Sequence, residues 1–460
     1  MHRLTAALLA FATTGLHVAA ADDSAPPPSP AATESTEVTQ LRERVARLES
    51  TINQMMEKDQ QAWLSDERAA QIRELVADTL ADADSRASLQ SSSATAGWDK
   101  GFFLQSADGN FRLNIGGQIQ FRYIWNYQND SPTDDDRYGF EVRRSKLVFK
   151  GHIFDPSWQY ELEIDSSRNT GGMQLGENVW VQKDFGGGFV IRAGQFKPFY
   201  LREENVSSRR LLAVERSNVN TAFTAGIAQG VQGMYTTPNW RIGAAYIDGF
   251  NTGNTPYNAE DNEFAFTGRT EFLAWGDWKA IEDDNAFRDG APALMFGLAG
   301  SFQRNEFGTG NNTPPPNFNN NEGDTFGTSA DVTWKVQGFT LSGIVIYQNV
   351  DSTDGARVPY NFDQWGAVLR GGLFVADDVE LYAVYEWGDY DQPNQANLST
   401  LTAGFNWFFH KNDIKWSTDI GYGFNPVAAP WVGTGGSGWR VDAPGEDGQI
   451  VFRSQIQLLF

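Results

Sequence analysis

Apolar and polar residues alternate with a period of two over most of the chain from residue 111 onward. In Phe111 to Asn126 every second residue is apolar or glycine, while Arg112, Asn114 and Gln118 are among the residues between them. The same alternation recurs at 158–165 and at 414–422. In a β-strand this period sends successive side chains to opposite faces, so that one face can contact hydrocarbon and the other water. A soluble β-sandwich with one inward face has the same alternation, and the pattern alone leaves both architectures open.

The number of strands and the lengths of their connections favour a barrel. About sixteen alternating segments can be counted, and bacterial outer-membrane barrels have an even number of strands. The segments begin near residues 111, 138, 157, 175, 188, 228, 239, 264, 293, 325, 338, 362, 378, 398, 413 and 449. Short turns alternate with long polar loops, as is typical of such barrels. The connection 276–292 breaks this rule, because it is long where a short turn is expected.

The last segment of the chain supports the same interpretation. Phe452, Ile456, Leu458 and Phe460 fall on one face, and the chain stops on the aromatic Phe460. A terminal aromatic strand resembles the signature by which outer-membrane barrels are recognised for assembly. The alternative, an edge strand of a soluble sheet, leaves an exposed apolar edge that soluble proteins avoid.

One long interruption, from Gly194 to Ile227, separates two of the alternating segments. It has about thirty residues without a strong period of its own, which is too long for an ordinary hairpin connection and indicates a functional role. The interruption is also basic, in a chain whose formal net charge is −22. If the flanking strands close into a barrel, this segment can fold into the lumen and form its narrowest part.

The first hundred residues have a different pattern. We expect a signal peptide at 1–21, a flexible linker at 22–36, a helical coiled-coil segment at 37–84 and a second linker at 85–100, before a barrel domain at 101–460. The coiled coil is predicted from apolar residues spaced alternately three and four apart. These residues are Val38, Leu41, Val45, Leu48, Ile52 and Met55. A single amphipathic helix lying on a neighbour remains an alternative.

Composition excludes several kinds of chemistry. The chain has no Cys and four His, so neither a structural zinc site nor a Cys/His nucleophile pair is expected. We expect no metal, no cofactor and no nucleic-acid partner. No run of about 18 apolar residues follows the signal segment, which excludes a helical membrane span.

Basic residues accumulate on the face of the strands that is predicted to point inward. Strand parity turns Arg144, Lys146 and Lys150 inward and leaves Arg143 ambiguous. Fixed positive charge along a pore favours the passage of anions over cations. Alternatively, these residues pair across the barrel with inward carboxylates. The candidate carboxylates are Glu161, Glu163, Asp165, Glu271 and Glu380.

Several short motifs resemble the phosphate-selective porin O and P family. They occur in the family's order, at 143–147 (RRSKL), 194–198 (GQFKP), 207–208 (SS) and 215–217 (ERS). The resemblance implies a sixteen-stranded, trimeric transmembrane barrel whose third outer loop folds inward. It also implies an anion site made by Ser207, Ser208 and Arg216 together with the pair Arg143 and Arg144. Glu204 stands where phosphate-binding members have a lysine, and this carboxylate opposes a bound anion.

These observations lead to one set of expected solute-binding residues. They are Arg144, Lys146, Lys197, Ser207, Ser208, Arg210 and Arg216. Serine hydroxyls and guanidinium groups can bind an oxyanion, although Ser207 and Ser208 also fit a turn, and Arg216 can pair with Glu215 or Glu203. We expect a porin of the bacterial outer membrane, exported by its signal peptide, that passes small hydrophilic solutes, including anions such as phosphate.

The expected partners are outer-membrane lipid and two further copies of the chain in a homotrimer. Two other function classes stay open. One is a structural barrel that tethers the cell envelope, with the coiled coil in contact with the cell wall. The other is a barrel enzyme, for which His152 and His410 are the only bases of their kind after the signal segment and neither has a serine motif beside it.

Overall fold

The computed structural model describes residues 39–52, 74, 76–77, 94–99, 101–129, 135–166, 171–256, 262–305, 322–353, 359–392, 395–432, 436–443 and 445–460. The chain divides into two compact units, residues 1–87 and residues 88–460. The predicted signal peptide and first linker lie outside the described residues, as do Val38 and Met55 of the heptad pattern.

In the first unit, residues 39–52 form an α-helix, and residues 74 and 76–77 are also helical. Leu41, Leu48 and Ile52 of the predicted heptad pattern lie on this helix with more than half of their surface exposed, and Val45 is half-buried. The helix therefore carries an apolar stripe, but it is described for one chain only, so the coiled coil stays a prediction. No helix among the described residues is long and apolar enough to span a bilayer.

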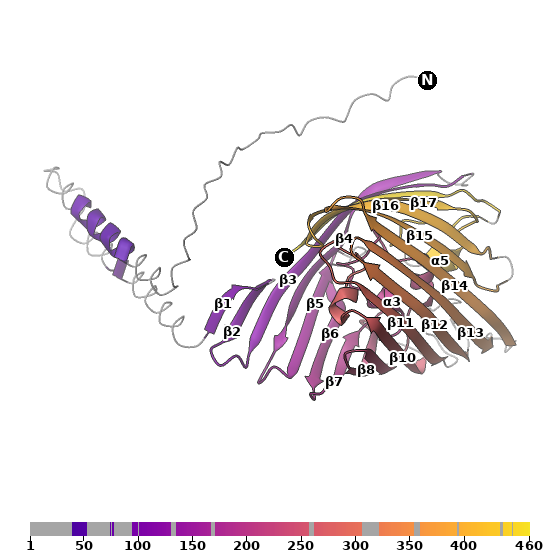
Figure 1. Cartoon of the computed structure of the whole chain (residues 1–460), viewed down its shortest axis with the longest axis horizontal. Coiled ribbons are helices and arrows are strands. Elements are labelled where there is room, and N and C mark those ends of the chain that lie inside the picture. Colours follow the sequence, from indigo (N-terminus) through magenta and orange to yellow (C-terminus); the bar gives the residue numbers. More distant parts are fainter. Residues whose placement is uncertain are drawn as a thin grey trace, which may run out of the picture. The chain divides into compact units, whose positions relative to one another are not determined.

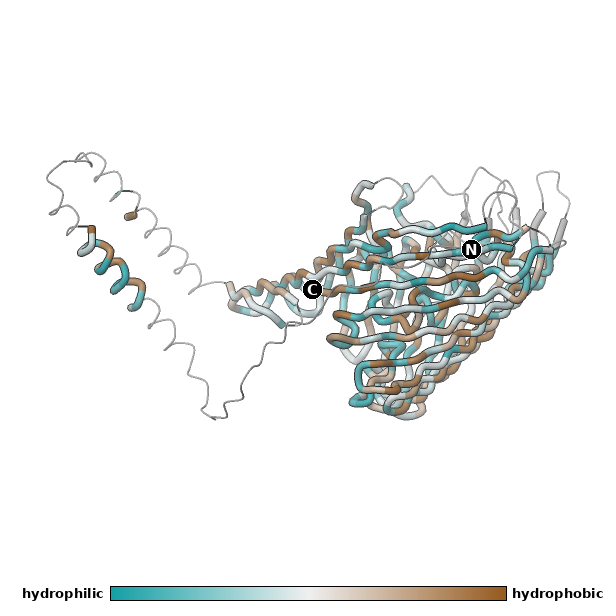
Figure 2. Tube along the Cα trace, turned by 90° about the horizontal axis from the view of Figure 1, so that it is seen from above, coloured by the Kyte–Doolittle hydropathy of each residue, from teal (hydrophilic) through white to brown (hydrophobic). Residues whose placement is uncertain are grey.

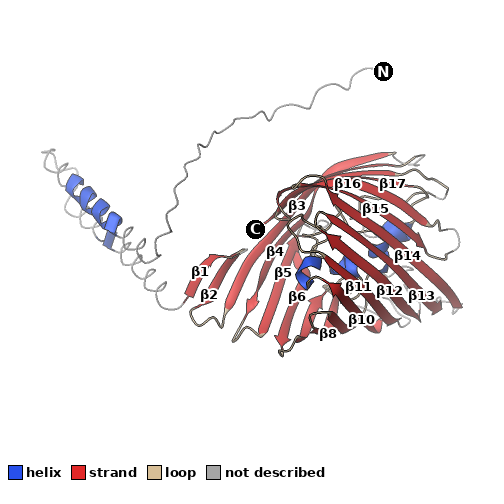
Figure 3. Cartoon of the chain, in the orientation of Figure 1, coloured by secondary structure: helices blue, strands red, loops and turns tan. Residues whose placement is uncertain are grey.

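The second unit is built on a closed ring of antiparallel strands (Figures 1 and 3). The strands of the ring are β3 (Arg112–Tyr127), β4 (Asp136–His152), β5 (Trp158–Ser166), β6 (Met173–Asp184), β7 (Phe189–Phe196), β8 (Ala228–Thr236), β9 (Trp240–Ile247), β10 (Asn262–Trp275), β11 (Ala293–Asn305), β12 (Glu322–Val336), β13 (Phe339–Thr353), β14 (Pro359–Phe374), β15 (Val379–Asp389), β16 (Leu398–His410), β17 (Ile414–Gly423) and β18 (Ile450–Leu459). Each pairs with the next, and β18 pairs with β3 from Ile450↔Tyr127 to Leu459↔Gln118. The prediction of a sixteen-stranded antiparallel barrel is confirmed.

The ring has the two faces that the alternation predicts. On β3, Ile119 is 41% exposed and Phe121 is 43% exposed, whereas Gln118, Gln120 and Arg122 between and beside them are at most 1% exposed. Along the strands the colour changes repeatedly between hydrophobic and hydrophilic (Figure 2). The outer face is therefore apolar and the inner face is polar, which is the arrangement that a bilayer requires.

A β-bulge settles the orientation of Arg143, which parity left ambiguous. In the register between β3 and β4, Gln120 pairs with Arg144 and Phe121 pairs with Val142, so Arg143 is the extra residue. A bulge redirects the side chain that it inserts. Both arginines consequently point into the ring, and both contact Glu215 there.

The predicted linker at 85–100 is wrong at its end, because Ala94–Trp98 is a strand, β1, which pairs with β2 (Phe102–Ser106). The reason lies at the closure of the ring. The partner strand β18 reaches only to Gln118 on β3, and β2 continues the sheet beyond it by pairing with β3 from Phe102↔Ile115 to Gln105↔Arg112. Pairing with β2 removes an open strand edge.

Apolar side chains from the connections and from the strands of the wall form a core inside the ring. The main cluster includes Phe196, Leu212, Phe223, Phe250 and Trp431. A smaller cluster forms at the long connection between β10 and β11, where the 3-10 helix η1 (Trp278–Ile281) packs Ile281 against Leu273 and Met295. The interior is thus filled by connections as well as by the side chains of the wall.

Candidate functional site

The connection between β7 and β8 contains two short helices, α3 (Arg202–Asn205) and α4 (Asn218–Phe223). Near its start, the amide of Phe199 donates a 2.8 Å hydrogen bond to the side-chain oxygen of Gln232 on β8. Ser217 begins α4 as an N-cap, because its hydroxyl accepts a 2.9 Å hydrogen bond from the amide of Asn220. These local contacts give a long irregular segment a defined path.

This connection reaches the wall that faces its own strands. Asn406 on β16 donates a 2.8 Å hydrogen bond to the Leu212 carbonyl, and Lys415 on β17 donates one of 2.9 Å to the Leu211 carbonyl. On β15, Glu386 accepts from the amide of Asn218 at 2.6 Å. The ring has sixteen strands, from β3 to β18, and β15 is the eighth strand after β7. The two strands therefore lie half of the circumference apart.

Glu215 fixes the middle of the connection to the strand wall by charge. Its carboxylate contacts Arg143 and lies 2.8 Å from Arg122 and 3.1 Å from Arg144. Burial alone would raise the pKa of the Glu215 carboxyl, but the three guanidinium groups hold that pKa well below its usual range. The carboxylate is therefore charged at neutral pH, and the three arginines offset its negative charge.

A second group of ion pairs joins the start of the connection to β4, β5 and β6. Lys146 lies 2.8 Å from Glu163 and 2.9 Å from Glu177. Glu177 also lies 2.9 Å from Lys197, which in turn lies 2.9 Å from Glu204. Positive and negative charges thus alternate along this row, and each lysine contacts two carboxylates.

Glu204 occupies the position at which the family pattern has a lysine, and its contacts explain how this chain accommodates it. Besides Lys197, it pairs with Arg216 at 3.5 Å and accepts a 2.7 Å hydrogen bond from the Asn220 side chain. Burial raises the pKa of the Glu204 carboxyl, but Arg216 and Lys197 lower it by more. Arg216 also donates to the carbonyls of Glu203 and Val206, so its partner is Glu204 rather than Glu215.

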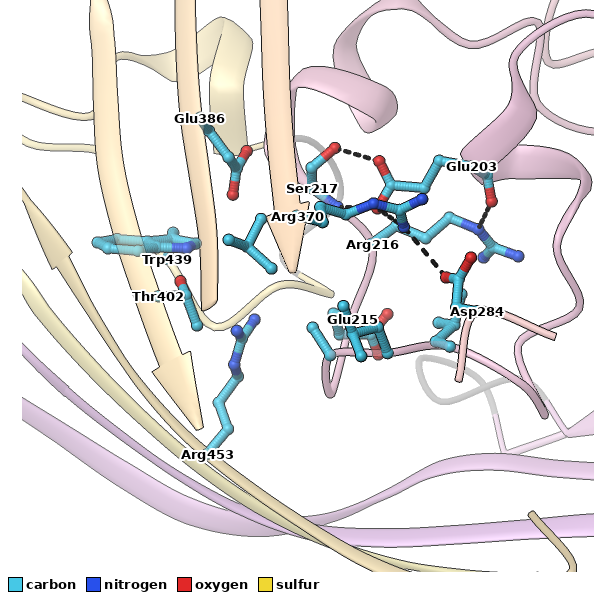
Figure 4. A pocket seen from close by; sticks show the side chains of 14 residues that line it. Glu203, Glu215, Arg216, Ser217, Asp284, Arg370, Glu386, Thr402, Trp439 and Arg453 are labelled. Atoms are coloured by element: carbon cyan, nitrogen blue, oxygen red, sulfur yellow. Dashed lines mark hydrogen bonds and ion pairs between the residues drawn. The ribbon is translucent and has the colours of Figure 1, made fainter. Parts of the chain in front are cut away.

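A third group lies where the β7–β8 connection meets the connection 276–292, which enters from the opposite end of the ring. Figure 4 shows Glu203, Arg370 and Asp284 facing one another. Arg370 of β14 lies 3.3 Å from Glu203 and 3.1 Å from Asp284. Burial raises the pKa of Asp284, but the charge of Arg370 and other cations holds it below its ordinary value. The Asp284 amide also donates a 3.0 Å hydrogen bond to the carbonyl of Arg210.

The structure does not bring the seven expected solute-binding residues into one site. Arg144, Lys146 and Arg216 are buried and paired with carboxylates. Ser208 is buried and donates a 3.2 Å hydrogen bond to Gln118, while Ser207 is exposed. Arg210 pairs with Glu282 at 2.9 Å and with Asp283 at 3.1 Å.

Three of the expected residues line a cavity of about 290 Å³ beside the β7–β8 connection, namely Lys197, Ser207 and Arg210. The same cavity is lined by Arg192, Arg202 and Arg241, none of which the family motifs single out. Strand parity does place Arg192 on the inner face. Arg202 and Arg241 carry no comparable signal, because their position depends on how two connections fold together inside the ring.

Within the described part of the chain, no cluster of three or more His, Asp or Glu side chains has the arrangement of a metal site. His152 contacts the carbonyl of Gly109 at 2.8 Å, and His410 lies 3.1 Å from Asp413. The charged groups inside the ring are suited to attracting and positioning small solutes, which is the usual role of charged residues that line a pore.

Comparison with known proteins agrees with this geometry. A family model described as phosphate-selective porin O and P matches residues 113–272, a range that includes β4, β5 and β6 and the whole β7–β8 connection. The predicted family resemblance is confirmed. No curated protein sequence matches this porin-like chain.

Solved structures show the same fold. An anion-selective porin from Comamonas acidovorans shares 13% sequence identity at a TM-score of 0.53, over 76% of this chain and 99% of that one. OmpT, an outer membrane protein of Vibrio cholerae, shares 16% sequence identity at a TM-score of 0.51. The match covers 76% of this chain and 98% of OmpT. Salmonella typhi OmpF in complex with daunomycin shares 12% sequence identity at a TM-score of 0.51. This match also covers 76% of this chain and 98% of the other. At these identities the likeness establishes the porin fold and nothing finer.

Proposed function

We propose that this protein is an outer-membrane porin that allows passive diffusion of small hydrophilic solutes. The observation that carries the proposal is the closed ring whose outer face is apolar and whose inner face is polar, as at Phe121 and Arg122 on adjacent positions of β3. A closed ring leaves no strand edge within the bilayer, and its polar interior can hold water.

The β7–β8 connection is proposed to limit the size of the solute. Its hydrogen bonds to β15, β16 and β17 support a path across the lumen. A segment in that position makes the channel narrower than the strand ring alone would be. The apolar cluster beneath it, which includes Phe196, Leu201 and Phe223, keeps it in place.

A preference for anions, among them phosphate, is the finer part of the proposal. It is supported by arginines on the inner face and in the β7–β8 connection, and by two that have no ion pair with a carboxylate among the described residues, Arg192 and Arg202. The Ser207, Ser208 and Arg216 set contributes less than the family pattern implies, because Arg216 is already paired with Glu204.

A homotrimer is proposed for the assembly, held together by the barrel and aided by the N-terminal helix. OmpT of Vibrio cholerae has been described in a trimer form, with a TM-score of 0.50 to this chain. The exposed stripe of Leu41, Leu48 and Ile52 on helix 39–52 supports self-association through a coiled coil. If the protein instead tethers the cell envelope, we propose that this helix contacts the cell wall.

Current through planar lipid bilayers tests the channel function. The purified protein should give stepwise increases in conductance as single channels insert. In a salt gradient, the sign of the reversal potential reports the preferred ion, and we expect preference for chloride over potassium. A protein that inserts without conducting contradicts the porin function, whereas a conducting, cation-selective channel contradicts only the anion preference.

A further inference from the structure

The side chains that line the cavity beside the β7–β8 connection carry more positive than negative charge. Five cationic side chains and two carboxylates line it. Both carboxylates are already engaged, since Glu271 pairs with Arg269 at 2.9 Å and Glu282 pairs with Arg210 at 2.9 Å. In the three buried ion-pair groups, by contrast, every arginine and lysine has a carboxylate within ion-pair distance.

Two arginines account for the excess. Arg192 on β7 directs its Nε and one terminal nitrogen to the amide oxygen of Gln182, at 3.1 and 2.9 Å, and stacks at 4.1 Å over the ring of Trp180. Arg202 in α3 donates to the carbonyl of Ile281 and is only 9% exposed. Its Nε has no hydrogen-bond acceptor in the described part of the chain.

Leaving a buried guanidinium without a carboxylate costs free energy, because charge is removed from water without full compensation. In the described residues, neither arginine has a carboxylate within ion-pair distance, and only the longer-range attraction of Glu161 for Arg192 and of Asp284 for Arg202 reduces this cost. An anion in the cavity would supply the missing charge. Arginine suits this role because its planar group can donate two hydrogen bonds to one oxyanion.

The cavity also has an apolar side. Phe199, Met234, Trp278 and Ile281 contribute to its lining, and the face of Trp278 is covered by Arg241 at 4.3 Å. Inorganic phosphate or sulfate has no apolar surface to place there. A volume of about 290 Å³ is close to the lower limit of ordinary small-molecule sites, which begin near ~300 Å³.

The position of the cavity places it on the path of a solute. Its wall comes from β7 to β10, close to the short turn at 237–239, and its other sides come from the β7–β8 connection and from the connection 276–292. A solute that passes the β7–β8 connection therefore meets this cavity on the side of the short turns.

We propose that the cavity is a binding site for a small organic anion that joins one charged group to an apolar, ring-sized body. Arg202 and Arg192 bind the charged group, and Met234 and Trp278 contact the body. The inference rests on the channel function proposed above and names the class of solute that the channel holds.

The test uses the full-length protein in planar bilayers, with benzoate as the probe and chloride as the current-carrying anion. Inorganic phosphate and benzyl alcohol serve as comparison probes that lack, respectively, the apolar body and the charge. Benzoate should halve the chloride current at a concentration about tenfold lower than phosphate, because burial of a ring contributes ~1.5–3 kcal/mol. Benzyl alcohol should have little effect.

Variants locate the site. Arg202→Gln should raise the half-blocking benzoate concentration at least about tenfold, because hydrogen bonds to charged groups contribute ~1.5–3 kcal/mol. Met234→Glu, which leaves Arg202 in place and adds a negative charge to the cavity, should have an effect in the same direction. Arg288→Gln is the matched control, since Arg288 belongs to the connection 276–292 but faces Asp377 rather than the cavity.

The outcomes separate the two proposals. A wild-type protein that does not conduct contradicts the channel function itself. A conducting channel that benzoate and phosphate block equally, or in which Met234→Glu leaves the benzoate block unchanged, overturns the organic-anion site alone. If Arg202→Gln prevents assembly of the barrel, the effect of Met234→Glu on the benzoate block decides whether the organic-anion site exists.

Discussion

Glu215 and Arg122 lie 2.8 Å apart although 93 residues separate them in the chain, and both side chains are almost completely buried. Arg122 belongs to the strand that closes the ring, and Glu215 belongs to the middle of the β7–β8 connection. This contact therefore joins the wall to the element that we propose narrows the lumen. Arg143 and Arg144 contact the same carboxylate.

Replacement of Glu215 should loosen the β7–β8 connection and expose uncompensated positive charge. We expect Glu215→Gln to destabilise the connection by ~3–5 kcal/mol, because removal of one partner leaves buried charges unpaired. In bilayers the variant should show noisier current and a shift of the reversal potential towards chloride. The matched control is Asp324→Asn, whose ion pair with Arg304 is about half exposed and should contribute only ~0–1 kcal/mol. Equal behaviour of the two variants argues against the role assigned to Glu215.

Glu204→Gln should have a milder effect than Glu215→Gln. The variant leaves Lys197 with Glu177 at 2.9 Å, and it leaves Arg216 with hydrogen bonds to the carbonyls of Glu203 and Val206. The connection should keep its position while the channel gains net positive charge. A larger chloride preference without added current noise is the expected result, measured as the reversal potential in a salt gradient. Increased noise equal to that of Glu215→Gln contradicts it.

The dependence of the current on pH should reflect the carboxylates of the β7–β8 connection. The surrounding cations hold the pKa of Glu215 well below its ordinary value of 4.5 and also lower the pKa of Glu204. A group with a lowered pKa in the folded state contributes its full stabilisation above its ordinary value, and this contribution is lost as the pH falls through the lowered pKa.

We therefore expect Glu204 and Glu215 to keep holding the connection from neutral pH down to 4.5, and the single-channel current to become noisier as these two groups are protonated in more acidic solution. The measurement is single-channel current in buffers of decreasing pH, with the same salt concentration throughout. A change centred between pH 6 and 7, which is roughly the range in which an unperturbed histidine titrates, is not expected from these two carboxylates. Such a change would assign the control of the current to other groups.

The C-terminal aromatic residue is fitted closely against β3. The amide of Gly117 donates a 2.7 Å hydrogen bond to the carbonyl of Phe460, and a methyl group on Gly117 would lie 2.3 Å from the ring of Phe460. Gly117→Ala should displace that ring and lower the yield of assembled barrel, measured as the fraction that stays folded in detergent gels without heating. Gly139→Ala on β4 is the control, because a methyl group there meets no atom within 4 Å. A normal yield for Gly117→Ala would show that the close fit is unimportant for assembly.

Much of the strand ring could be predicted from the sequence, because the period of two is a local property of each segment. The start of β9 near 239, of β11 near 293 and of β16 near 398 follows directly from that alternation. The bulge at Arg143 could not be predicted in this way, since it arises from the pairing of β4 with β3. Strand β1 carries no such signal, because it is only five residues long, follows a stretch rich in Ser and Ala that resembles a linker, and is paired with β2.

The candidate site was predicted less completely than the ring. Parity placed Lys146 on the inner face, and Glu163 was among its possible partners, as the 2.8 Å ion pair shows. Glu177 contacts both Lys146 and Lys197, but the sequence does not single it out. The face predicted for one strand does not reveal which side chains of other elements it meets. Arg202 is a similar case, since its surroundings come from a connection 79 residues away.

The contacts of the β7–β8 connection with β15, β16 and β17 also have a mechanical consequence. A thin-walled cylinder is easily flattened into an ellipse by sideways pressure, whereas one with an internal tie between facing walls resists that deformation. The hydrogen bonds that Glu386 accepts and that Asn406 and Lys415 donate supply such a tie, at the level at which we propose that the lumen is narrowest. The aperture can therefore keep its diameter when the tension or thickness of the surrounding lipid changes.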